Sequence, residues 1–356
     1  MERTLSEMKT GAPPRDSCGF DRPEPAVSAA DSAVRVRGLS FQYPVRKSRG
    51  RALRRRSTVA LERLALDSVD LEIFRGEVFG LLGPNGGGKT TLFRILCTSL
   101  AATSGSVSVL GLDPRRDSFE IRRRIGVVFQ NPSLDRKLTV RENLVHHARL
   151  YGLAARERSR RIEESLKVVG LPDRAESMVE ELSGGLARRV EIAKCLLHQP
   201  ELLILDEPSA GLDPAARADL WRYLLQLPGT GVTVLATTHL MEEAERCSRV
   251  AILDGGRIVA LGRPDDLRGE IGGDVVTIDA DHAPRLAQRL REKLGVEAEA
   301  AENRVRFEQA AGRRSIATIV DLAGEDLRSI SVSRPTLEDV FLKRTGHRFW
   351  AEKADG

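Results

Sequence analysis

The sequence predicts a doubly wound α/β fold with parallel strands, followed by a smaller α+β unit. Between residues 77 and 267, short apolar segments alternate with longer segments of helical periodicity. Four segments are apolar along their whole length, as strands covered on both faces of a parallel sheet are: residues 78–82, 125–129, 202–205 and 232–236. Residues 138–170 have mostly helical character and predict a helical subdomain within this unit.

The chain is expected to begin with a tail and a large domain. Residues 1–33 contain four prolines among Ser, Ala and charged residues, which predicts a disordered tail. Residues 34–270 are expected to form the large domain, which opens with alternating strand signals at 34–36 and 69–73. Between these signals lies a basic insertion at about 45–63, with seven Lys or Arg in eleven consecutive residues.

Residues 271–356 are expected to form a small domain. The Gly272-Gly273 pair is typical of a linker, and strand and helix signals follow it. In order, these are a strand at 275–278, a helix at 284–294, a hairpin around Glu302-Asn303, a helix at 315–322 and a strand at 329–332. This β-α-β-β-α-β order suggests a ferredoxin-like unit.

Composition excludes several classes of protein. With 41% hydrophobic and 30% charged residues over 356 positions, the chain is typical of a globular protein. No apolar run approaches the ~18 residues that a bilayer span requires, and residues 1–10 are charged with no apolar core behind them. Neither a membrane span nor a signal peptide is therefore predicted. Four cysteines without paired spacing favour a reducing, cytosolic setting.

The net charge of +5 is a local feature of the chain. The first 60 residues carry 13 Lys and Arg against 6 Asp and Glu, so the excess of cations lies there. Only 4% of the residues are aromatic, which leaves few side chains for stacking on bases. The balance does not favour nucleic acid as a partner.

A glycine-rich segment carries the clearest functional signal. It fits the pattern G-x-x-x-x-G-K-[ST] between a predicted strand and a predicted helix, the context of a phosphate-binding loop (P-loop). Its residues are Gly83, Pro84, Asn85, Gly86, Gly87, Gly88, Lys89 and Thr90. Glycines let backbone N–H groups converge on phosphate oxygens, and the helix start adds about half a positive charge. Lys89 supplies a full charge to the β- and γ-phosphates, and the Thr90 hydroxyl can bind Mg²⁺. The alternative is a glycine-rich turn without a ligand.

Two adjacent carboxylates follow a buried strand. Asp206 can hold Mg²⁺ directly or through water, because hard oxygen ligands suit this ion. Glu207 is expected to orient or deprotonate the water that attacks the γ-phosphate. The alternative is an acidic pair that caps a helix before Pro208. That alternative is weaker beside a P-loop, because chemistry at phosphates needs such a metal ligand.

A second glycine pair stands before another helical segment. Ser183, Gly184 and Gly185 precede a helical run at 187–197, so their N–H groups are candidates for a further anion-binding helix start. The alternative is an ordinary serine cap followed by flexible glycines.

Two polar residues end predicted parallel strands, where ligand contacts in open α/β sheets gather. Gln130 follows the strand at 125–129, and the alternative is a solvated side chain. His239 follows the strand at 232–236. A structural role is the default for a single histidine, but the strand-end position favours a phosphate contact.

Taken together, these segments resemble the nucleotide-binding subunit of an ABC transporter over about residues 34–267. The resemblance implies a P-loop NTPase of ABC type that binds ATP and Mg²⁺ and hydrolyses ATP, with Lys89, Glu207 and His239 as the catalytic group. It assigns phosphate binding to residues 83–91, including Thr91, and nucleotide and Mg²⁺ contacts to Gln130. The family's magnesium-binding aspartate corresponds to Asp206 and its switch histidine to His239. Its signature loop corresponds to residues 182–186 and its D-loop to residues 209–213.

One further residue matches the family pattern, and two features depart from it. Tyr43 matches the aromatic residue that stacks on adenine, and its alternative is a core or edge tyrosine. Leu186 departs from the family pattern, whose signature loop ends in Gln. The basic insertion is a second departure, and it either rests on anionic lipid or is a solvated charged loop.

The resemblance also implies partners. Two subunits, as a homodimer or heterodimer, would sandwich two ATP molecules, with the P-loop of one facing Ser183 and Gly185 of the other. A separate membrane-spanning permease would dock near Gln130 and residues 138–151, which places the chain at the cytoplasmic face of the membrane without direct contact to the transported substrate. Residues 237–245 and 335–341 resemble the drug-, lipid- or polysaccharide-type exporters.

Two other functions stay open at the level of sequence. One is a soluble ABC-type ATPase that acts on nucleic acid or ribosomes, which the basic insertion supports. The other is an ATP-sensing module without turnover, and the intact Lys89, Asp206, Glu207 and His239 argue against it.

Overall fold

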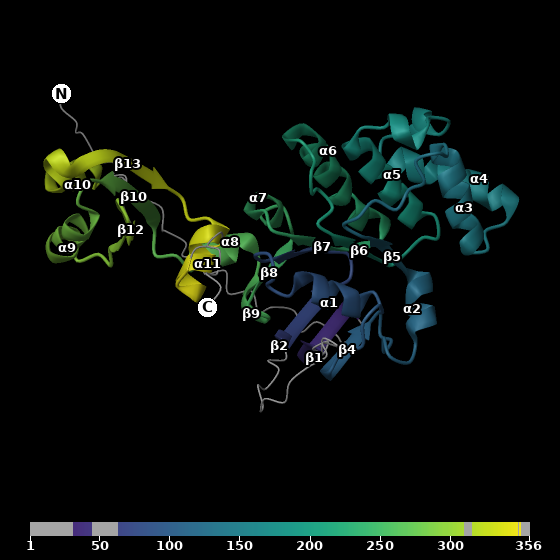
Figure 1. Cartoon of the computed structure of the whole chain (residues 1–356), viewed down its shortest axis with the longest axis horizontal. Coiled ribbons are helices and arrows are strands. Elements are labelled where there is room, and N and C mark those ends of the chain that lie inside the picture. Colours follow the sequence, from purple (N-terminus) through teal and green to yellow (C-terminus); the bar gives the residue numbers. More distant parts are fainter. Residues whose placement is uncertain (1–30, 45–62, 310–314, 348, 350–356) are drawn as a thin grey trace, which may run out of the picture.

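The computed structural model describes residues 31–44, 63–309, 315–347 and 349 (Figure 1). The basic insertion predicted at about 45–63 lies outside the described residues except for its last position, and so does most of the predicted tail. Strand β1 (Ser32–Tyr43) begins inside that predicted tail, and Ala33 is fully buried. The last two residues of the expected tail therefore belong to a sheet.

A six-stranded sheet in the order β5-β6-β7-β3-β8-β9 forms the centre of the large domain. Its strands are β3 (Val78–Leu82), β5 (Ile125–Val128), β6 (Leu202–Asp206), β7 (Thr233–Thr238), β8 (Arg249–Asp254) and β9 (Arg257–Gly262). The four strands predicted from apolar runs pair in parallel, as does β8 with β3, whereas β9 is antiparallel to β8. In β6, Leu203 and Leu205 enter the core on one face and the alternate residues enter the core on the other, which explains why the strand is apolar throughout.

A second sheet of three antiparallel strands, β2-β1-β4, lies beside the first. The sequence predicted only short parts of β1 and β2 (Arg63–Phe74) and did not predict β4 (Ser104–Val109). Register shifts interrupt the pairing of β1 with both neighbours, and the first half of β4 is exposed. Neither β1 nor β4 therefore keeps a regular alternation of apolar and polar residues along its whole length.

Helices cover both faces of the large sheet. α1 (Lys89–Leu96) packs on one face, whereas α5 (Gly184–Leu196) and α6 (Pro214–Leu224) pack on the other (Figure 1). The remaining helical elements of this domain are α2 (Ser118–Arg124), α3 (Val140–Leu150), α4 (Ala155–Val168), η2 (Pro172–Arg174), η3 (Val179–Glu181), η4 (Leu227–Thr230), α7 (Met241–Ala244) and α8 (Pro264–Gly269). α3, α4 and α5 group at one end of the molecule, where the sequence predicted a helical subdomain.

The C-terminal unit has the predicted β-α-β-β-α-β order. Its elements are β10 (Asp274–Ala280), α9 (Ala283–Leu294), β11 (Glu299–Ala301), β12 (Arg304–Gln309), α10 (Ile316–Ala323), η6 (Gly324–Asp326) and β13 (Leu327–Ser333). The strands pair antiparallel in the order β11-β12-β10-β13, and α9 and α10 share one core with this sheet.

The last helix returns to the large domain. α11 (Leu337–Thr345) packs against α8 and β9, and Phe341 and Phe349 are buried in the core of the large domain. The His347 imidazole Nε2 lies 3.0 Å from a carboxylate oxygen of Asp254 at the end of β8. None of the described helices is long and apolar enough to span a bilayer.

Candidate active site

The loop between β3 and α1 is shaped by close contacts that leave no room for side chains. A Cβ on Gly83 would lie 2.3 Å from the carbonyl oxygen of Leu253 on β8. Gly88 has a φ of +108°, which residues with side chains rarely adopt, and a Cβ there would lie 2.6 Å from the carbonyl oxygen of Ala65 on β2. The glycines of the P-loop pattern therefore have a steric cause, because β2 and β8 hold the loop at these positions.

The loop ends in a helix start that carries a buried cation. α1 begins at Lys89, and no described side chain caps this end, so its first N–H groups and the helix dipole favour an anion. Lys89 is 4% exposed, and its Nζ donates to the carbonyl oxygens of Gly83 at 2.8 Å and Pro84 at 3.1 Å. Burial lowers the pKa of Lys89, and the nearby carboxylates of Glu207 and Asp206 act in the opposite direction.

The parallel neighbours β6 and β7 bring their carboxyl ends to one edge of the sheet. Asp206 ends β6 and is 4% exposed, and its Oδ1 accepts a hydrogen bond from Thr237 Oγ1 of β7 at 2.6 Å. Burial raises the pKa of Asp206, and the neighbouring Glu207 adds to this effect. The site thus holds a carboxylate largely removed from water, whose charge a cation would stabilise.

The Glu207 carboxylate lies between two other predicted site residues. One oxygen is 3.5 Å from Lys89 Nζ, and the other is 3.2 Å from His239 Nδ1. The backbone N–H of Glu207 donates to Thr237 Oγ1 at 2.9 Å, and its φ is 45°, a left-handed value that is uncommon for a residue with a side chain. The structure therefore brings together the three residues that the sequence predicted as catalytic.

The oxygen donors at this edge suit Mg²⁺. Asp206 ends β6 at this edge, and Thr90 is an exposed residue in the first turn of α1. Mg²⁺ is commonly bound by one or two carboxylates together with the phosphates of a substrate. Thr90 and Asp206 are thus the residues that fit this ion here.

Other predicted residues lie outside this cluster. Ser183 is the N-cap of α5, which begins three residues earlier than predicted, and its Oγ accepts from the Leu186 N–H at 3.4 Å. Gln130 is exposed after β5 and lines a cavity of about 290 Å³ together with Gly184. Within the described part of the chain, no hydrogen bond joins the side chain of Ser183 or Gln130 to the P-loop.

Tyr43 lies beside the first turn of α1. Its hydroxyl forms a 3.1 Å hydrogen bond with Thr91 Oγ1, and its ring packs edge-on against Phe41 with centroids 4.9 Å apart. The Tyr43 side chain is half-buried, whereas Thr91 is buried. This contact places an aromatic residue next to the P-loop and uses the Thr91 hydroxyl that was predicted to bind nucleotide.

Sequence reasoning missed two buried charged residues that adjoin the site. Arg188 on α5 donates to the backbone carbonyl oxygens of Glu207 and Pro208, and Glu243 on α7 accepts from the hydroxyl of Ser209. Each belongs to a pair of like residues in a helix, and only folding distinguishes the buried member from its neighbour. No local sequence signal marks them.

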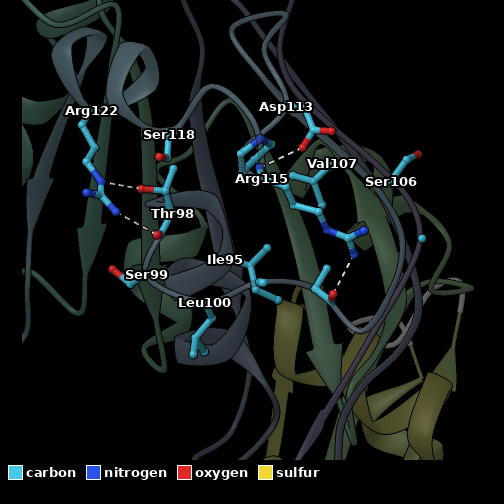
Figure 2. Close-up of a pocket in the computed structure, with 14 residues that line it drawn as sticks. Ile95, Thr98, Ser99, Leu100, Ser106, Val107, Asp113, Arg115, Ser118 and Arg122 are labelled. Carbon is cyan, nitrogen blue, oxygen red and sulfur yellow. Dashed lines mark hydrogen bonds between the residues drawn. The ribbon is translucent and has the colours of Figure 1, made fainter.

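A separate cavity of about 490 Å³ lies at the other end of α1 (Figure 2). Its two arginines bond to its own walls: Arg122 Nε donates to Thr98 Oγ1 at 2.7 Å, and Arg115 donates to the Ala102 carbonyl oxygen at 2.6 Å. None of the predicted site residues lines it. This cavity is therefore not part of the phosphate-binding cluster.

The clustered residues have the chemistry that phosphoryl transfer to water requires. A buried ammonium and a helix start can receive phosphate oxygens, a buried carboxylate can hold a metal ion, and a second carboxylate can orient water.

The chain is similar to known proteins over both of its parts. Residues 66–210 match the ABC transporter family, and residues 262–345 match the C-terminal domain of DrrA1-3-like ATP-binding proteins. The daunorubicin resistance ATP-binding protein DrrA3 of Streptomyces coeruleorubidus is 37% identical over 326 residues, which cover 89% of this chain and 97% of the relative. The Nod factor export ATP-binding protein I of Burkholderia thailandensis is 41% identical over 294 residues, covering 80% and 93%.

Solved structures are similar over much of the chain. The structure of cbiO1 from Clostridium perfringens, part of the ABC transporter complex cbiONQ, has a TM-score of 0.59 at 27% identity, covering 74% of this chain and 96% of that one. A dimeric ATP-binding cassette in a post-hydrolysis state bound to ADP and Pi has a TM-score of 0.56 at 27% identity, covering 65% and 98%.

Proposed function

The chain belongs to the ABC transporter family as an ATP-binding and ATP-hydrolysing subunit, and we propose that it drives an exporter at the cytoplasmic face of the cell membrane. In this proposal, ATP closes a dimer of two such subunits and hydrolysis reopens it. A separate membrane-spanning permease converts the closure into movement of a substrate that does not contact this chain.

The position of the Glu207 carboxylate carries the catalytic part of the proposal. It lies 3.5 Å from Lys89 Nζ and 3.2 Å from His239 Nδ1, beside the loop expected to receive the phosphates. Lys89 would exchange its bonds to loop carbonyls for bonds to the β- and γ-phosphates, and Glu207 would take a proton from the attacking water. His239 would contact the γ-phosphate, and Tyr43 would stack on adenine. Mg²⁺, held by Thr90 and Asp206 and reached by Gln130 from outside the cluster, would neutralise charge that develops on the phosphate oxygens.

The exposed start of α5 supports the proposal of a dimer. A helix N-terminus favours an anion, and at the start of α5 Ser183 and Gly184 are exposed. This end of the helix is therefore accessible to a phosphate group bound by another subunit. In the proposed dimer, Ser183, Gly184 and Gly185 face the γ-phosphate bound by the P-loop of the second subunit. Loss of that phosphate removes the bridge between the two subunits.

An exposed apolar surface supports docking of a permease. Phe119 on α2, Phe129 after β5 and Leu150 at the end of α3 are 72%, 46% and 84% exposed. The Tyr151 hydroxyl donates to the backbone carbonyl of Arg122 at 3.4 Å, which joins the end of α3 to α2. Large apolar side chains exposed near the region expected to dock a permease are consistent with an interaction site there. The names of the relatives, in daunorubicin resistance and Nod factor export, support an exporter.

The dimer is tested with a chain that binds ATP but turns it over slowly. Glu207→Gln with Mg·ATP is expected to sediment as a dimer and without nucleotide as a monomer. Adding Ser183→Glu places a carboxylate against the γ-phosphate and is expected to keep the chain monomeric. Ser159→Glu, at an exposed serine of α4, is the control and leaves the dimer intact. A dimer that tolerates Ser183→Glu would place the second subunit's contact elsewhere.

Docking to the permease is tested by co-purification from membranes. Leu150→Asp is expected to reduce recovery of a multi-span membrane protein with the chain, while phosphate release by the isolated chain stays unchanged. Salt-dependent binding to nucleic acid, without any membrane partner, would instead support a soluble ABC-type ATPase.

A further inference from the structure

The left-handed backbone of Glu207 needs an explanation. A residue with a side chain at a φ of 45° is strained, and such strain persists only where the surroundings fix the conformation. We propose that Arg188 and Glu243 are positioning residues that clamp residues 207–209 from two sides and so keep the Glu207 carboxylate beside Lys89 and His239. This inference rests on the proposed role of Glu207 in ATP hydrolysis.

Arg188 holds the first side of the segment through backbone carbonyls. Its side chain is 8% exposed and reaches from α5 to the loop that follows β6. Nε donates to the Pro208 carbonyl oxygen at 2.8 Å, and Nη2 donates to that of Glu207 at 3.4 Å. The same guanidinium donates to the carbonyl oxygens of Phe129 at 2.7 Å and Gln130 at 3.3 Å. The planar fork of an arginine can serve these acceptors at once, whereas a lysine ammonium cannot.

Glu191 compensates the buried charge of Arg188. Its carboxylate is 4% exposed and lies 2.6 Å from Arg188 Nη1. The other carboxylate oxygen accepts from both the N–H and the hydroxyl of Ser133, at 2.5 and 2.9 Å. The pair therefore fixes α5 to the loop after β5, and this anchored helix gives Arg188 a rigid base from which to hold Glu207.

Glu243 holds the other side of the segment through hydroxyl groups. Its carboxylate is 2% exposed, and one oxygen accepts from Ser209 Oγ, two residues beyond Glu207. The second oxygen accepts from Thr238 Oγ1 at 2.5 Å, and that hydroxyl in turn accepts from the Leu240 N–H at 2.9 Å. These bonds bracket His239, so Glu243 ties the loop that carries Glu207 to the turn that carries His239.

The two residues act on one segment but reach it from different elements. Arg188 belongs to α5 and Glu243 to α7, the short helix that follows His239. Loss of either clamp lets Glu207 relax toward an ordinary φ, which moves its carboxylate away from Lys89 and His239. Among the described residues, no hydrogen bond joins Arg188 or Glu243 to the P-loop. We therefore expect the P-loop to keep binding nucleotide, although Arg188 also donates to the Gln130 carbonyl.

The test compares each residue with its neighbour in the sequence. Arg188→Lys and Glu243→Gln in the full chain are expected to lower kcat for phosphate release by roughly 10- to 100-fold, because a small misplacement of a reacting group has effects of this size. The affinity for ATP should stay within about twofold, since binding does not depend on this orientation. Arg189→Lys and Glu242→Gln are the controls: Arg189 donates to Val169 and Tyr223 instead, and Glu242 is exposed.

A second arm separates positioning from a general structural role. The same substitutions are made in a Glu207→Gln background, where the carboxylate that they position is gone. A role exerted through Glu207 predicts no further loss of kcat in that background, whereas a general structural role predicts the same loss in both. Equal losses in both backgrounds, or test variants that match their controls, would overturn the inference.

The outcomes also separate this inference from the proposed function. If Glu207→Gln alone leaves turnover unchanged, the proposed catalytic role fails, whatever the other variants do. If Arg188→Lys or Glu243→Gln fails to bind ATP or melts early, Ser209→Ala takes its place, because it removes a single bond of the clamp. It is expected to lower kcat partially in the wild-type background and not at all in Glu207→Gln.

Discussion

Gly83→Ala perturbs the P-loop by a single methyl group. No left-handed φ is involved at this glycine, so the conflict is purely steric. The added Cβ would lie 2.3 Å from the Leu253 carbonyl oxygen, where ordinary contacts begin at 3.4 Å, so the loop and β8 must separate by roughly 1 Å. Overpacking of this kind costs about 1–3 kcal/mol of stability. A displacement of that size at a binding loop is expected to weaken ATP binding by roughly 10- to 100-fold.

The assay is calorimetric titration of ATP in the presence of Mg²⁺, with thermal melting in the absence of nucleotide. Gly229→Ala is the matched control, because a Cβ there meets no heavy atom within 4 Å. We expect Gly229→Ala to match wild type in both measurements. If Gly83→Ala bound ATP as tightly as Gly229→Ala, the close approach to β8 would not be what shapes the nucleotide site.

Three further substitutions have defined outcomes. Burial raises the pKa of Asp206, so the charged carboxylate opposes folding at neutral pH, and this penalty fades as the pH falls. Asp206→Asn should therefore gain about 0.5–2 kcal/mol of stability in the absence of nucleotide. A lower Tm than that of wild type would contradict this. Hydrogen bonds from Arg124, and secondarily Arg75, hold the pKa of Glu201 at about 2, so its stabilisation is complete above the ordinary 4.5 and is lost as the pH falls toward 2. Glu201→Gln should therefore melt below wild type at pH 7, with a gap that closes toward pH 2; a gap independent of pH would refute the linkage. Leu186 packs against the core, so Leu186→Gln should lose about 1 kcal/mol of stability in a thermal melt. The rate of phosphate release should change by less than about twofold. A larger change in rate would show that this side chain positions the signature loop.

The residues of the P-loop and of the strand ends could be located from sequence. The spacing from Gly83 to Lys89 is local, and its context of strand and helix follows from hydrophobic pattern alone. Asp206 and Glu207 were expected after a buried strand and His239 at the ligand edge of another strand. The structure pairs these strands in parallel as β6 and β7, which places the three residues at one edge of the sheet.

The residues that hold these groups in place could not be located from sequence. Arg188 donates to backbone carbonyls, and every residue has a carbonyl, so no pattern identifies its partners. Glu243 gains its partners through the pairing of distant segments. β4 is half-exposed and lacks the alternation that predicts a strand. The proposed facing of Ser183 and the P-loop depends on a second subunit, which a single chain does not determine.

Phosphate release by the purified full chain with Mg·ATP tests the catalytic role of Glu207 most directly. Wild type and Glu207→Gln are compared at matched occupancy by ATP, which a binding titration establishes for each. We predict that both bind ATP with similar affinity and that Glu207→Gln releases phosphate roughly 10²- to 10⁴-fold more slowly, the usual effect of removing a positioned base. Equal rates of release at equal occupancy would contradict the role of the carboxylate that lies between Lys89 and His239.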